Sequence, residues 1–169
     1  MRELYPRDLY AGRGKRGAVA DIQRFVGVWD LEEIEDEDED FLEGKRGKAP
    51  AVGFERPVGL LIYLASGEMS VNFAGSTRVP FLREFSPSPS ELAAAGAAYG
   101  GYAGRWELET GASVVVHLPL VSFVPNRVGA RVRRSYSFTE NSSLLALQPI
   151  AISSHETAPV RVLKWRRRT

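Results

Sequence analysis

One of the two histidines in this chain, His117, lies within a mostly apolar run, SVVVHLPLVSF, at residues 113–123. An imidazole can exchange protons near neutral pH, and it is also a common metal ligand. A metal site is disfavoured because His155 is the only other histidine and the chain has no cysteine. Both faces of the run are apolar, so two roles stay open for His117. It is either a hydrogen-bonded core residue, or a residue that contacts a ligand or acts as an acid or base.

A guanidinium and a phenol alternate with apolar residues in RVRRSYSF, residues 131–138. A period of two places Arg134 and Tyr136 on the same face as Val132 and Phe138. A cation on an apolar face needs a partner, either an acidic neighbour in a buried ion pair or a ligand. The chain shows no Ser/His/Asp spacing and no glycine-rich phosphate loop, so covalent catalysis is not supported. The candidate catalytic residues are therefore Arg134, Tyr136 and His117, with no metal and no cofactor.

The elements that would position these residues are strands, because apolar and polar residues alternate with a period of two. Besides the segments above, strands are expected at residues 25–33, 102–109, 143–149 and 160–165. Pro119 cannot donate to a ladder, so a bulge or an unpaired edge is expected there. One helix is indicated at SELAAAGAAY, residues 90–99, with Ser90 as its cap. This pattern predicts an all-β fold, an antiparallel up-and-down β-barrel with about eight strands and one short helix.

The stretch at residues 59–73 reads as a β-hairpin whose register the apolar residues decide. With a two-residue turn at Ser66-Gly67, six apolar residues share one face in three opposed pairs: Leu60 with Phe73, Ile62 with Val71, and Leu64 with Met69. A three-residue loop would instead place Leu64 opposite Glu68 and mix polar with apolar side chains. A slip of one residue moves every side chain to the other face, so we predict the two-residue turn.

Composition limits the classes of partner. The 22 basic and 21 acidic residues leave a formal net charge of +1, so no overall field attracts nucleic acid or a membrane. No signal segment or membrane-length apolar run is visible, so we expect a cytoplasmic protein. We expect a flexible N-terminal arm at residues 1–20 and a single domain at 21–169. The acidic block at residues 33–40, the basic GKRGK at 44–48 and the C-terminal KWRRRT are interpreted as solvated segments.

Short motifs along the chain resemble, in order, those of the bacterial and fungal lipocalin-like domain family. FVGVWDL resembles the Gly-x-Trp signature of lipocalins, carried by Gly27 and Trp29. The other matching residues, within about residues 25–167, are Pro57, Gly59, Leu61, Tyr63, Gly67, Met69, Ser70, Val71, Tyr102, Ala103, Gly104, Glu107, Val115, Val116, His117, Ser122, Pro125, Asn126, Val128, Gly129, Arg134, Tyr136, Leu163 and Trp165. The family often has a second histidine and a glutamate where this chain has Leu118 and Leu120. That departure argues against a mechanism that needs a His–His or His–Glu pair.

The resemblance implies a barrel that holds one small hydrophobic molecule. In lipocalins the Gly-x-Trp tryptophan closes one end of the barrel beneath a C-terminal arginine, and here those residues would be Trp29 and Arg166. The expected ligand-binding residues, taken from the inward alternation, are Met69, Val71, Phe73, Tyr102, Trp106, Leu108 and Phe138.

Lipocalin-like barrels are used in secondary metabolism to fold flexible substrates. The first hypothesis is therefore a cofactor-free cyclase or isomerase, Diels–Alder-type cyclisation included, acting on a polyketide- or terpenoid-like intermediate in natural product biosynthesis. The alternative is a non-catalytic carrier of a small hydrophobic molecule, because an aromatic pocket with few polar groups suits either role. Neither nucleic acid nor membrane is an expected partner, and a homo-oligomer is left open.

Overall fold

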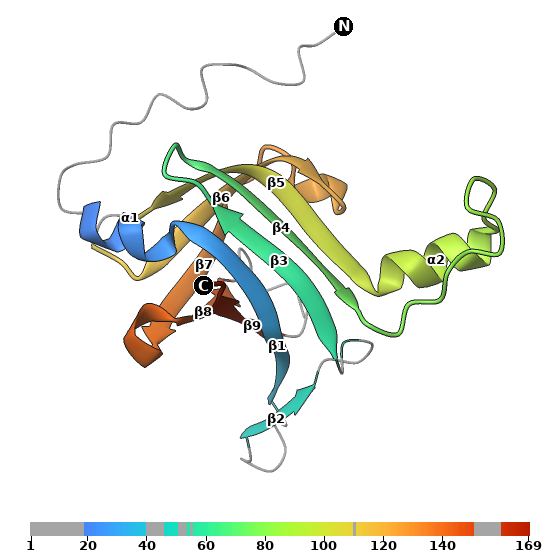
Figure 1. Ribbon diagram of the computed structural model, residues 1–169, viewed down its shortest axis with the longest axis horizontal. Coiled ribbons are helices and arrows are strands. Elements are labelled where there is room, and N and C mark those ends of the chain that lie inside the picture. Colours follow the sequence, from blue (N-terminus) through green and yellow to red (C-terminus); the bar gives the residue numbers. More distant parts are fainter. Residues whose placement is uncertain (1–18, 40–45, 51–53, 55, 110, 151–159) are drawn as a thin grey trace, which may run out of the picture.

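The computed structural model describes residues 19–39, 46–50, 54, 56–109, 111–150 and 160–169. Its strands form one antiparallel sheet in the order β2-β1-β3-β4-β5-β6-β7-β8-β9, and an additional pairing of β1 with β9 closes eight of them into a barrel (Figure 1). The strands are β1 (Gly27–Glu39), β2 (Arg46–Pro50), β3 (Pro57–Tyr63), β4 (Glu68–Gly75), β5 (Tyr99–Leu108), β6 (Val114–Ser122), β7 (Val132–Thr139), β8 (Leu144–Pro149) and β9 (Val160–Arg167). The predicted eight-stranded up-and-down barrel is confirmed.

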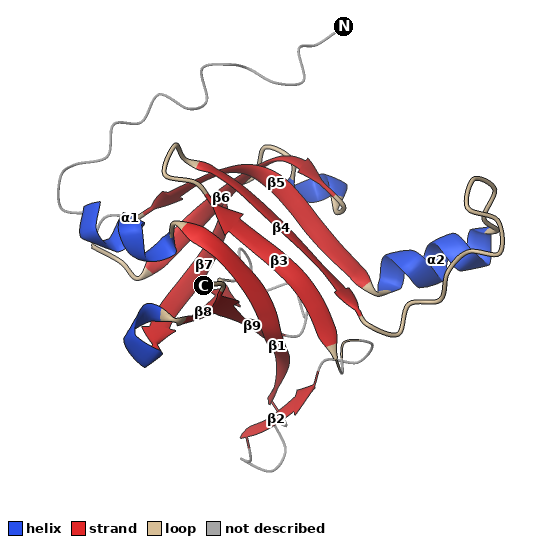
Figure 2. Ribbon diagram, viewed as in Figure 1, coloured by secondary structure: helices blue, strands red, loops and turns tan. Residues whose placement is uncertain are grey.

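The helical elements lie outside the barrel wall (Figure 2). They are the α-helices α1 (Val19–Phe25) and α2 (Pro89–Ala97) and the 3₁₀ turns η3 (Pro125–Arg127) and η4 (Glu140–Ser142). The predicted helix is confirmed as α2, but its N-cap is Ser88 rather than Ser90. The Ser88 hydroxyl accepts from Glu91 N while the Glu91 carboxylate accepts from Ser88 N, a reciprocal capping box.

Helix α1 was not predicted, and the expected boundary of the N-terminal arm at residue 20 falls inside it. Residues 1–18 of that arm lie outside the described residues. The Phe25 ring closes this end of the barrel, with its centroid 4.8 Å from that of Tyr136 and 5.4 Å from that of Tyr63. Burying a large aromatic ring at a barrel mouth removes a large apolar area from water, which explains why so short a helix is held there.

The core lies inside the barrel and follows the predicted alternation on β4, β5 and β7. Buried hydrophobic residues of one cluster are Phe25, Trp29, Leu31, Ile34, Phe54, Leu61, Tyr63, Met69, Val71, Tyr102, Trp106, Val115, Leu145, Leu147 and Trp165. Partly buried side chains that pack against this cluster include Phe73, Leu108, Tyr136 and Phe138. All seven residues predicted to bind a ligand therefore belong to the core or pack directly against it.

The predicted register of the β3–β4 hairpin is wrong by one residue. Tyr63 pairs with Met69 and Leu61 with Val71, so Leu60, Ile62 and Leu64 lie on the outer face. The Leu64 amide donates to Glu68 O across a three-residue loop that ends at Gly67, whose φ is +97°. A glycine in this left-handed region lets the third loop residue form a bulge, and this turn chemistry outweighs the apolar pattern of the outer face.

A bulge next to Pro119 is confirmed. Gly104 of β5 pairs with Pro119, whereas Ala103 pairs with Val121, which leaves Leu120 as an extra residue in β6. The backbones approach closely here, because a Cβ on Gly104 would lie 2.1 Å from the Leu118 carbonyl oxygen. The bulge bends β6 just beyond His117 and leaves no room at position 104 for any residue but glycine.

The described parts of the acidic and basic blocks form paired strands rather than a loop, and the C-terminal segment begins within a barrel strand and ends in exposed residues. Residues 35–39 of β1 pair with residues 46–50 of β2, and residues 40–45 lie outside the described residues. Strand β9 closes the barrel, with Trp165 fully buried between Leu31 and Leu145. Among the described residues, no helix is long and apolar enough to span a membrane.

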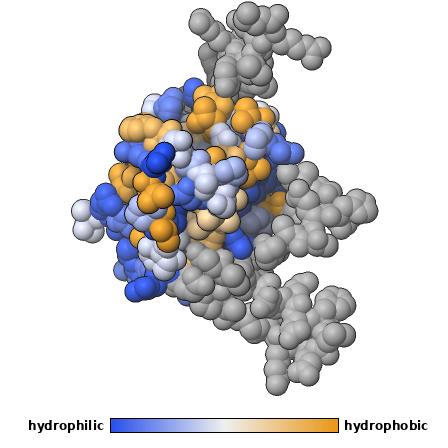
Figure 3. All heavy atoms as spheres, turned by 90° about the vertical axis from the view of Figure 1, so that its right-hand side faces the viewer, coloured by the Kyte–Doolittle hydropathy of each residue, from blue (hydrophilic) through white to orange (hydrophobic). Residues whose placement is uncertain are grey.

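Segment 76–98, which includes α2 and which we call the α2 extension, projects away from the barrel between β4 and β5 (Figures 1 and 2). None of the α2 residues is buried. Figure 3, viewed from this side, shows groups of hydrophobic residues interspersed with hydrophilic ones on the surface.

Candidate functional site

His117 is buried in the barrel between two tyrosines. It lies on β6 opposite Trp106 of β5 and Val132 of β7, and its side chain is 1% exposed. Its Nε2 lies 2.6 Å from the hydroxyl of Tyr63 on β3, and its Nδ1 lies 2.7 Å from the hydroxyl of Tyr102 on β5. Three strands therefore supply one continuous Tyr63–His117–Tyr102 chain of hydrogen bonds, which we call the Tyr–His–Tyr cluster.

His117 and Tyr63 are neutral at neutral pH. Burial, assisted by the nearby charge of Arg134, lowers the pKa of His117 to about 3. Burial also raises the pKa of the Tyr63 hydroxyl well above its usual range, with Tyr102 adding to the rise and Arg134 opposing it. An imidazole with so low a pKa is a weak base, so the cluster is suited to donating hydrogen bonds rather than to removing protons from carbon.

The cluster holds one more hydrogen-bond donor than it uses. A neutral imidazole has one N–H and one bare nitrogen, so it donates to one tyrosine oxygen and accepts from the other hydroxyl. The tyrosine that accepts keeps its own O–H, and no described residue accepts from it. Whichever tautomer His117 adopts, either Tyr63 or Tyr102 has a hydroxyl proton left over, and an oxygen of a ligand is a fitting acceptor.

Arg134 faces the same interior as His117. It lies on β7 opposite Val115, which is fully buried, and opposite Pro149 of β8, so its half-buried side chain shares their inward face. Within the described part of the chain it makes no hydrogen bond and no ion pair, so the buried ion pair considered from the sequence is not found there. Its outward neighbours behave differently, since Arg131 and Arg133 pair with Glu107 and Glu109.

Tyr136, the third predicted catalytic residue, makes no hydrogen bond with this cluster. Its ring packs against Phe138 and against Phe25, whose ring also contacts Tyr63. Burial raises the pKa of its hydroxyl, and the charges that modify that rise are those of Asp21 and Arg24 on α1. The structure thus brings His117 and Arg134 to one region of the interior and places Tyr136 on the side of α1.

The predicted ligand-binding residues divide in the same way. Tyr102 belongs to the Tyr–His–Tyr cluster, and Trp106 packs on Tyr63 with ring centroids 4.8 Å apart. Met69 and Val71 lie beside them, because they pair with Gly104 and Tyr102 across β4 and β5. Phe138 instead lies at the α1 end, 5.0 Å from Phe25 between ring centroids.

Tyr63 is the functional residue that sequence reasoning missed. The two-residue turn predicted for the hairpin turned its side chain outward, whereas the three-residue loop turns it inward to His117. The signal was present in the loop itself, where Gly67 follows Ala65 and Ser66 as the third residue.

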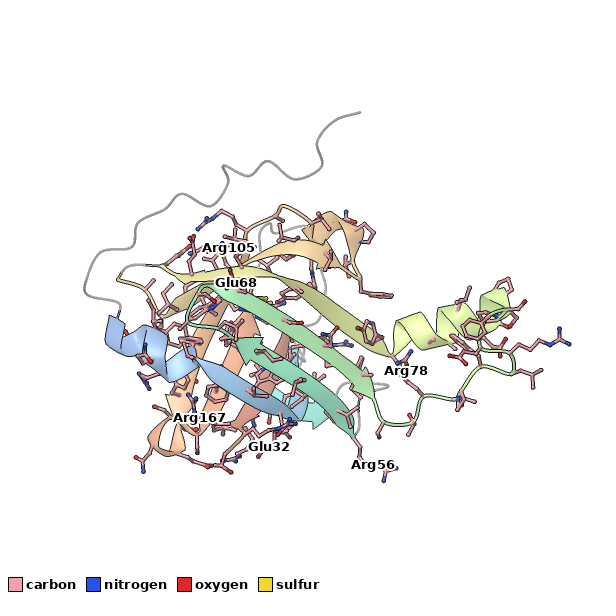
Figure 4. All side chains as sticks on the ribbon, turned by 45° about the horizontal axis from the view of Figure 1, so that its top comes forward. Glu32, Arg56, Glu68, Arg78, Arg105 and Arg167 are labelled. Atoms are coloured by element: carbon pink, nitrogen blue, oxygen red, sulfur yellow. The ribbon has the colours of Figure 1, made fainter. Side chains whose placement is uncertain are left out.

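Arg167 rather than Arg166 closes the end of the barrel, a second correction by one residue. The Arg167 guanidinium lies 4.1 Å from the Trp29 ring centroid, and its NH1 donates to Val26 O at 2.8 Å (Figure 4). Arg166 points outward and pairs with Glu32 and Glu140. Trp29 itself donates from Nε1 to Phe25 O at 2.8 Å, so the side chains of both Trp29 and Arg167 have hydrogen-bond partners at this end.

A hollow of about 250 Å³ lies on the outer surface where β4, β5 and β6 meet. Its lining residues are Asn72, Tyr99, Gly101, Tyr102, Ala103, Val121, Ser122 and Phe123. The hollow is smaller than the roughly 300–1,000 Å³ usual for small-molecule sites. Among the described residues, no group of three acidic, histidine or cysteine side chains is placed to hold a metal ion. His155 lies outside the described residues.

Comparison with protein families agrees with this geometry. The family model described as a lipocalin-like domain matches residues 26–168, which is nearly the whole barrel. No curated protein matches the chain. A closed eight-stranded antiparallel barrel and a family match over most of the sequence place the chain in the lipocalin-like domain family.

Proposed function

We propose that the barrel binds a small, mostly apolar molecule with its one polar oxygen at the Tyr–His–Tyr cluster and Arg134, and that it acts on this molecule as a cofactor-free isomerase or cyclase. A lipocalin-like barrel by itself indicates binding of a hydrophobic small molecule. The observation that carries the proposal further is the surplus hydroxyl proton in a cluster that is otherwise buried and paired.

The surplus proton is best assigned to Tyr102. Tyr102 is 5% exposed whereas Tyr63 is fully buried, so an unused O–H is less costly on Tyr102. In that arrangement Tyr63 donates to Nε2 of His117, and the Nδ1–H of His117 donates to the Tyr102 oxygen. The imidazole thereby orients the Tyr102 hydroxyl, and its own N–H strengthens the hydrogen bond that Tyr102 offers to a ligand.

A donor of this kind, with a cation beside it, stabilises negative charge that develops on a carbonyl oxygen. Loss of one such donor typically reduces turnover by about 100- to 1,000-fold in enzymes that depend on it. The apolar walls at Met69, Val71 and Trp106 would fix the conformation of a flexible substrate, which supplies the orientation that cyclisation requires. Because neutral His117 is a weak base, reactions driven by polarisation and confinement fit this interior better than reactions that begin with proton removal from carbon.

A carrier that binds the same kind of molecule without changing it remains the second candidate. The specific observation that favours it is the low pKa of His117, which leaves the interior without an effective general base. Turnover separates the two candidates: a linear ketone that carries a conjugated diene and an enone would lose ultraviolet absorbance as a cyclase closes it, whereas a carrier would bind the ketone unchanged.

Binding can be tested before a substrate is known, with two fluorescent naphthalene probes. Anilinonaphthalene sulfonate carries an anionic group and N-phenylnaphthylamine does not, although their ring systems are alike. Arg134→Ala should weaken binding of the anionic probe by about tenfold and leave the neutral probe unaffected, because only the former uses the cation. Val71→Trp should abolish binding of both probes by filling the interior.

Matched variants distinguish the interior from the outer hollow. Tyr102→Phe and His117→Ala should weaken a carbonyl ligand, whereas Tyr99→Phe removes a hydroxyl that bonds Asn72 outside the barrel and should not. If Val71→Trp leaves both probes bound and Tyr99→Phe weakens them, the ligand occupies the outer hollow and the proposal is wrong. Tyr136→Phe should have a smaller effect than Tyr102→Phe, since its hydroxyl faces α1.

A further inference from the structure

The α2 extension exposes large apolar side chains at its tip. Val79 is 83% exposed, Leu82 is 90% exposed and Phe85 is 92% exposed. Side chains of this kind rarely stand almost fully in water on a monomeric protein unless they meet a partner.

The extension is built as a fixed projection. The Leu82 amide donates to Glu91 Oε1 at 2.8 Å, which ties the tip to the first turn of α2, and Ser88 caps the same turn. At its base a Cβ on Gly96 would lie 3.2 Å from the ring of Phe123, the residue that follows β6, so α2 packs closely on this side chain. The Arg78 guanidinium lies 5.5 Å from the Tyr99 ring centroid (Figure 4). The tip is therefore held at a defined place relative to the barrel.

Exposed apolar side chains are also found at the base of the extension, where the Phe123 ring packs against Gly96 of α2. The exposed large hydrophobic residues of the α2 extension and of the 121–128 segment are Val79, Leu82, Phe85, Leu92, Val121, Phe123, Val124 and Val128. At roughly 100–200 Å² for each fully exposed side chain, scaled by its exposure, their apolar areas sum to on the order of 800 Å². This sum is comparable with the roughly 800 Å² that each partner buries in a standard interface.

The same surface contains a hollow that could accept a bulky side chain. The outer hollow of about 250 Å³ lies beside the base of the extension, with Tyr99, Val121 and Phe123 among its lining residues. It is too small for most ligands but of a size to take one phenyl or isobutyl group. The apolar tip of one copy can fill the apolar hollow of a second copy. In a two-fold symmetric dimer this contact occurs twice, once in each direction.

Charge favours a second copy over a lipid surface. The extension carries Arg78 and Arg83 against Glu84 and Glu91, so its net charge is zero. It lacks the excess of basic residues that attracts a helix to anionic lipid, and two copies would not repel each other.

We propose that two copies of this chain form a symmetric dimer in which Leu82 and Phe85 of each α2 extension dock into the outer hollow of the other copy. The proposal is independent of what the barrel interior binds, and it places the β4–β5–β6 surface at the centre of the interface.

The oligomeric state of the full chain tests this directly by analytical ultracentrifugation. The wild-type chain should sediment as a dimer at micromolar concentration, and Phe85→Glu and Leu82→Glu should each raise the dissociation constant by about 30-fold or more. Leu64→Glu is the matched control, because Leu64 is 48% exposed in the β3–β4 turn at the other end of β4. A monomeric wild-type chain, or equal dissociation by Leu64→Glu, would overturn the proposal.

Cross-linking fixes the geometry, since the natural chain has no cysteine. A mixture of Phe85→Cys and Val121→Cys chains should form a mixed disulfide on mild oxidation, and a mixture of Leu64→Cys and Val121→Cys chains should not. Absence of the first product in a dimeric sample would place the interface elsewhere. Flotation of the wild-type chain with neutral phosphatidylcholine vesicles, lost in Phe85→Glu, would instead identify the tip as a membrane-insertion element and contradict the dimer.

Discussion

Two arginines at the barrel interior differ in their hydrogen bonds, and the difference distinguishes the closed end of the barrel from the proposed ligand-binding region. Arg167 covers Trp29 and donates to the backbone oxygens of Ser142, Val26 and Arg24. Arg134 lies among apolar residues and makes no hydrogen bond or ion pair with any described residue. One guanidinium has its donors occupied by the protein, while the other keeps its donors available.

The tyrosine and tryptophan side chains of the interior also differ in whether the protein supplies an acceptor for each donor. Trp29 donates to Phe25 O and Trp106 donates to Leu64 O, so both indoles have partners. The Tyr–His–Tyr cluster instead keeps one hydroxyl proton that no described residue accepts. A buried donor without an acceptor costs about 1–3 kcal/mol, so this surplus proton is better explained by ligand recognition than by stability.

The largest effect is expected at the closed end. Trp29→Ala should lower the free energy of unfolding by about 3–5 kcal/mol, because it removes a fully buried indole, its hydrogen bond and the surface on which Arg167 stacks. Urea unfolding followed by circular dichroism measures the change. Leu64→Ala, at an exposed position, should cost far less, and similar losses for the two variants would show that Trp29 does not close the barrel.

The next effect is a dependence of stability on pH that belongs to His117. The unfolded chain binds a proton on this imidazole near pH 6.5, whereas burial lowers the pKa in the folded chain to about 3. Between these values the unfolded state holds one more proton, so the free energy of unfolding falls as the pH falls, by up to about 1.4 kcal/mol per pH unit. His117→Gln should flatten the curve between pH 6.5 and 4.5, which lies above the range where carboxylates with lowered pKa, such as Glu32 and Glu109, contribute.

A substitution at an exposed position without a titratable group provides the control for this experiment. Leu64→Gln should leave the slope between pH 6.5 and 4.5 as it is in the wild-type chain. An unchanged slope in His117→Gln would mean that the imidazole is accessible to protons in the folded state and that the cluster is not closed to solvent.

The alternation of residues was sufficient to predict the barrel and the inward faces of β4, β5 and β7, because a strand repeats every two residues whatever surrounds it. It was insufficient wherever a loop or bulge decides which of the two faces turns inward. The third loop residue, Gly67, moved Tyr63 from the outer face to the interior. At the closed end, Arg167 rather than Arg166 reaches Trp29, because Arg167 pairs with Trp29 and lies on the same face of β9 as the buried Trp165. Helix α1 carries too few residues for a helical period to appear in the sequence.

Removal of the unpaired cation should separate stability from binding. Arg134→Met keeps the apolar stem and removes a half-buried charge that has no described partner, so the free energy of unfolding should stay within about 1 kcal/mol of the wild-type value or rise. Affinity for the anionic naphthalene probe should fall by about tenfold in the same variant. Strong destabilisation would reveal that Arg134 is a structural residue like Arg167, and the contrast between the two arginines would be lost.

The smallest expected effect distinguishes the two tyrosines of the cluster. If Tyr63 donates to Nε2 and Tyr102 accepts from Nδ1–H, then Tyr63→Phe leaves a buried imidazole nitrogen without its donor and costs about 1–3 kcal/mol. Tyr102→Phe also deprives the imidazole of a partner, but it removes the surplus hydroxyl proton, so its cost should be lower by about 1 kcal/mol. Long-range ¹H–¹⁵N correlation spectra of His117 report the tautomer directly and should show the proton on Nδ1. A proton on Nε2, together with a larger loss of stability in Tyr102→Phe than in Tyr63→Phe, would assign the unused hydroxyl proton to Tyr63. Since Tyr63 is the more deeply buried of the two, a ligand would then have to reach past Tyr102 towards the closed end of the barrel.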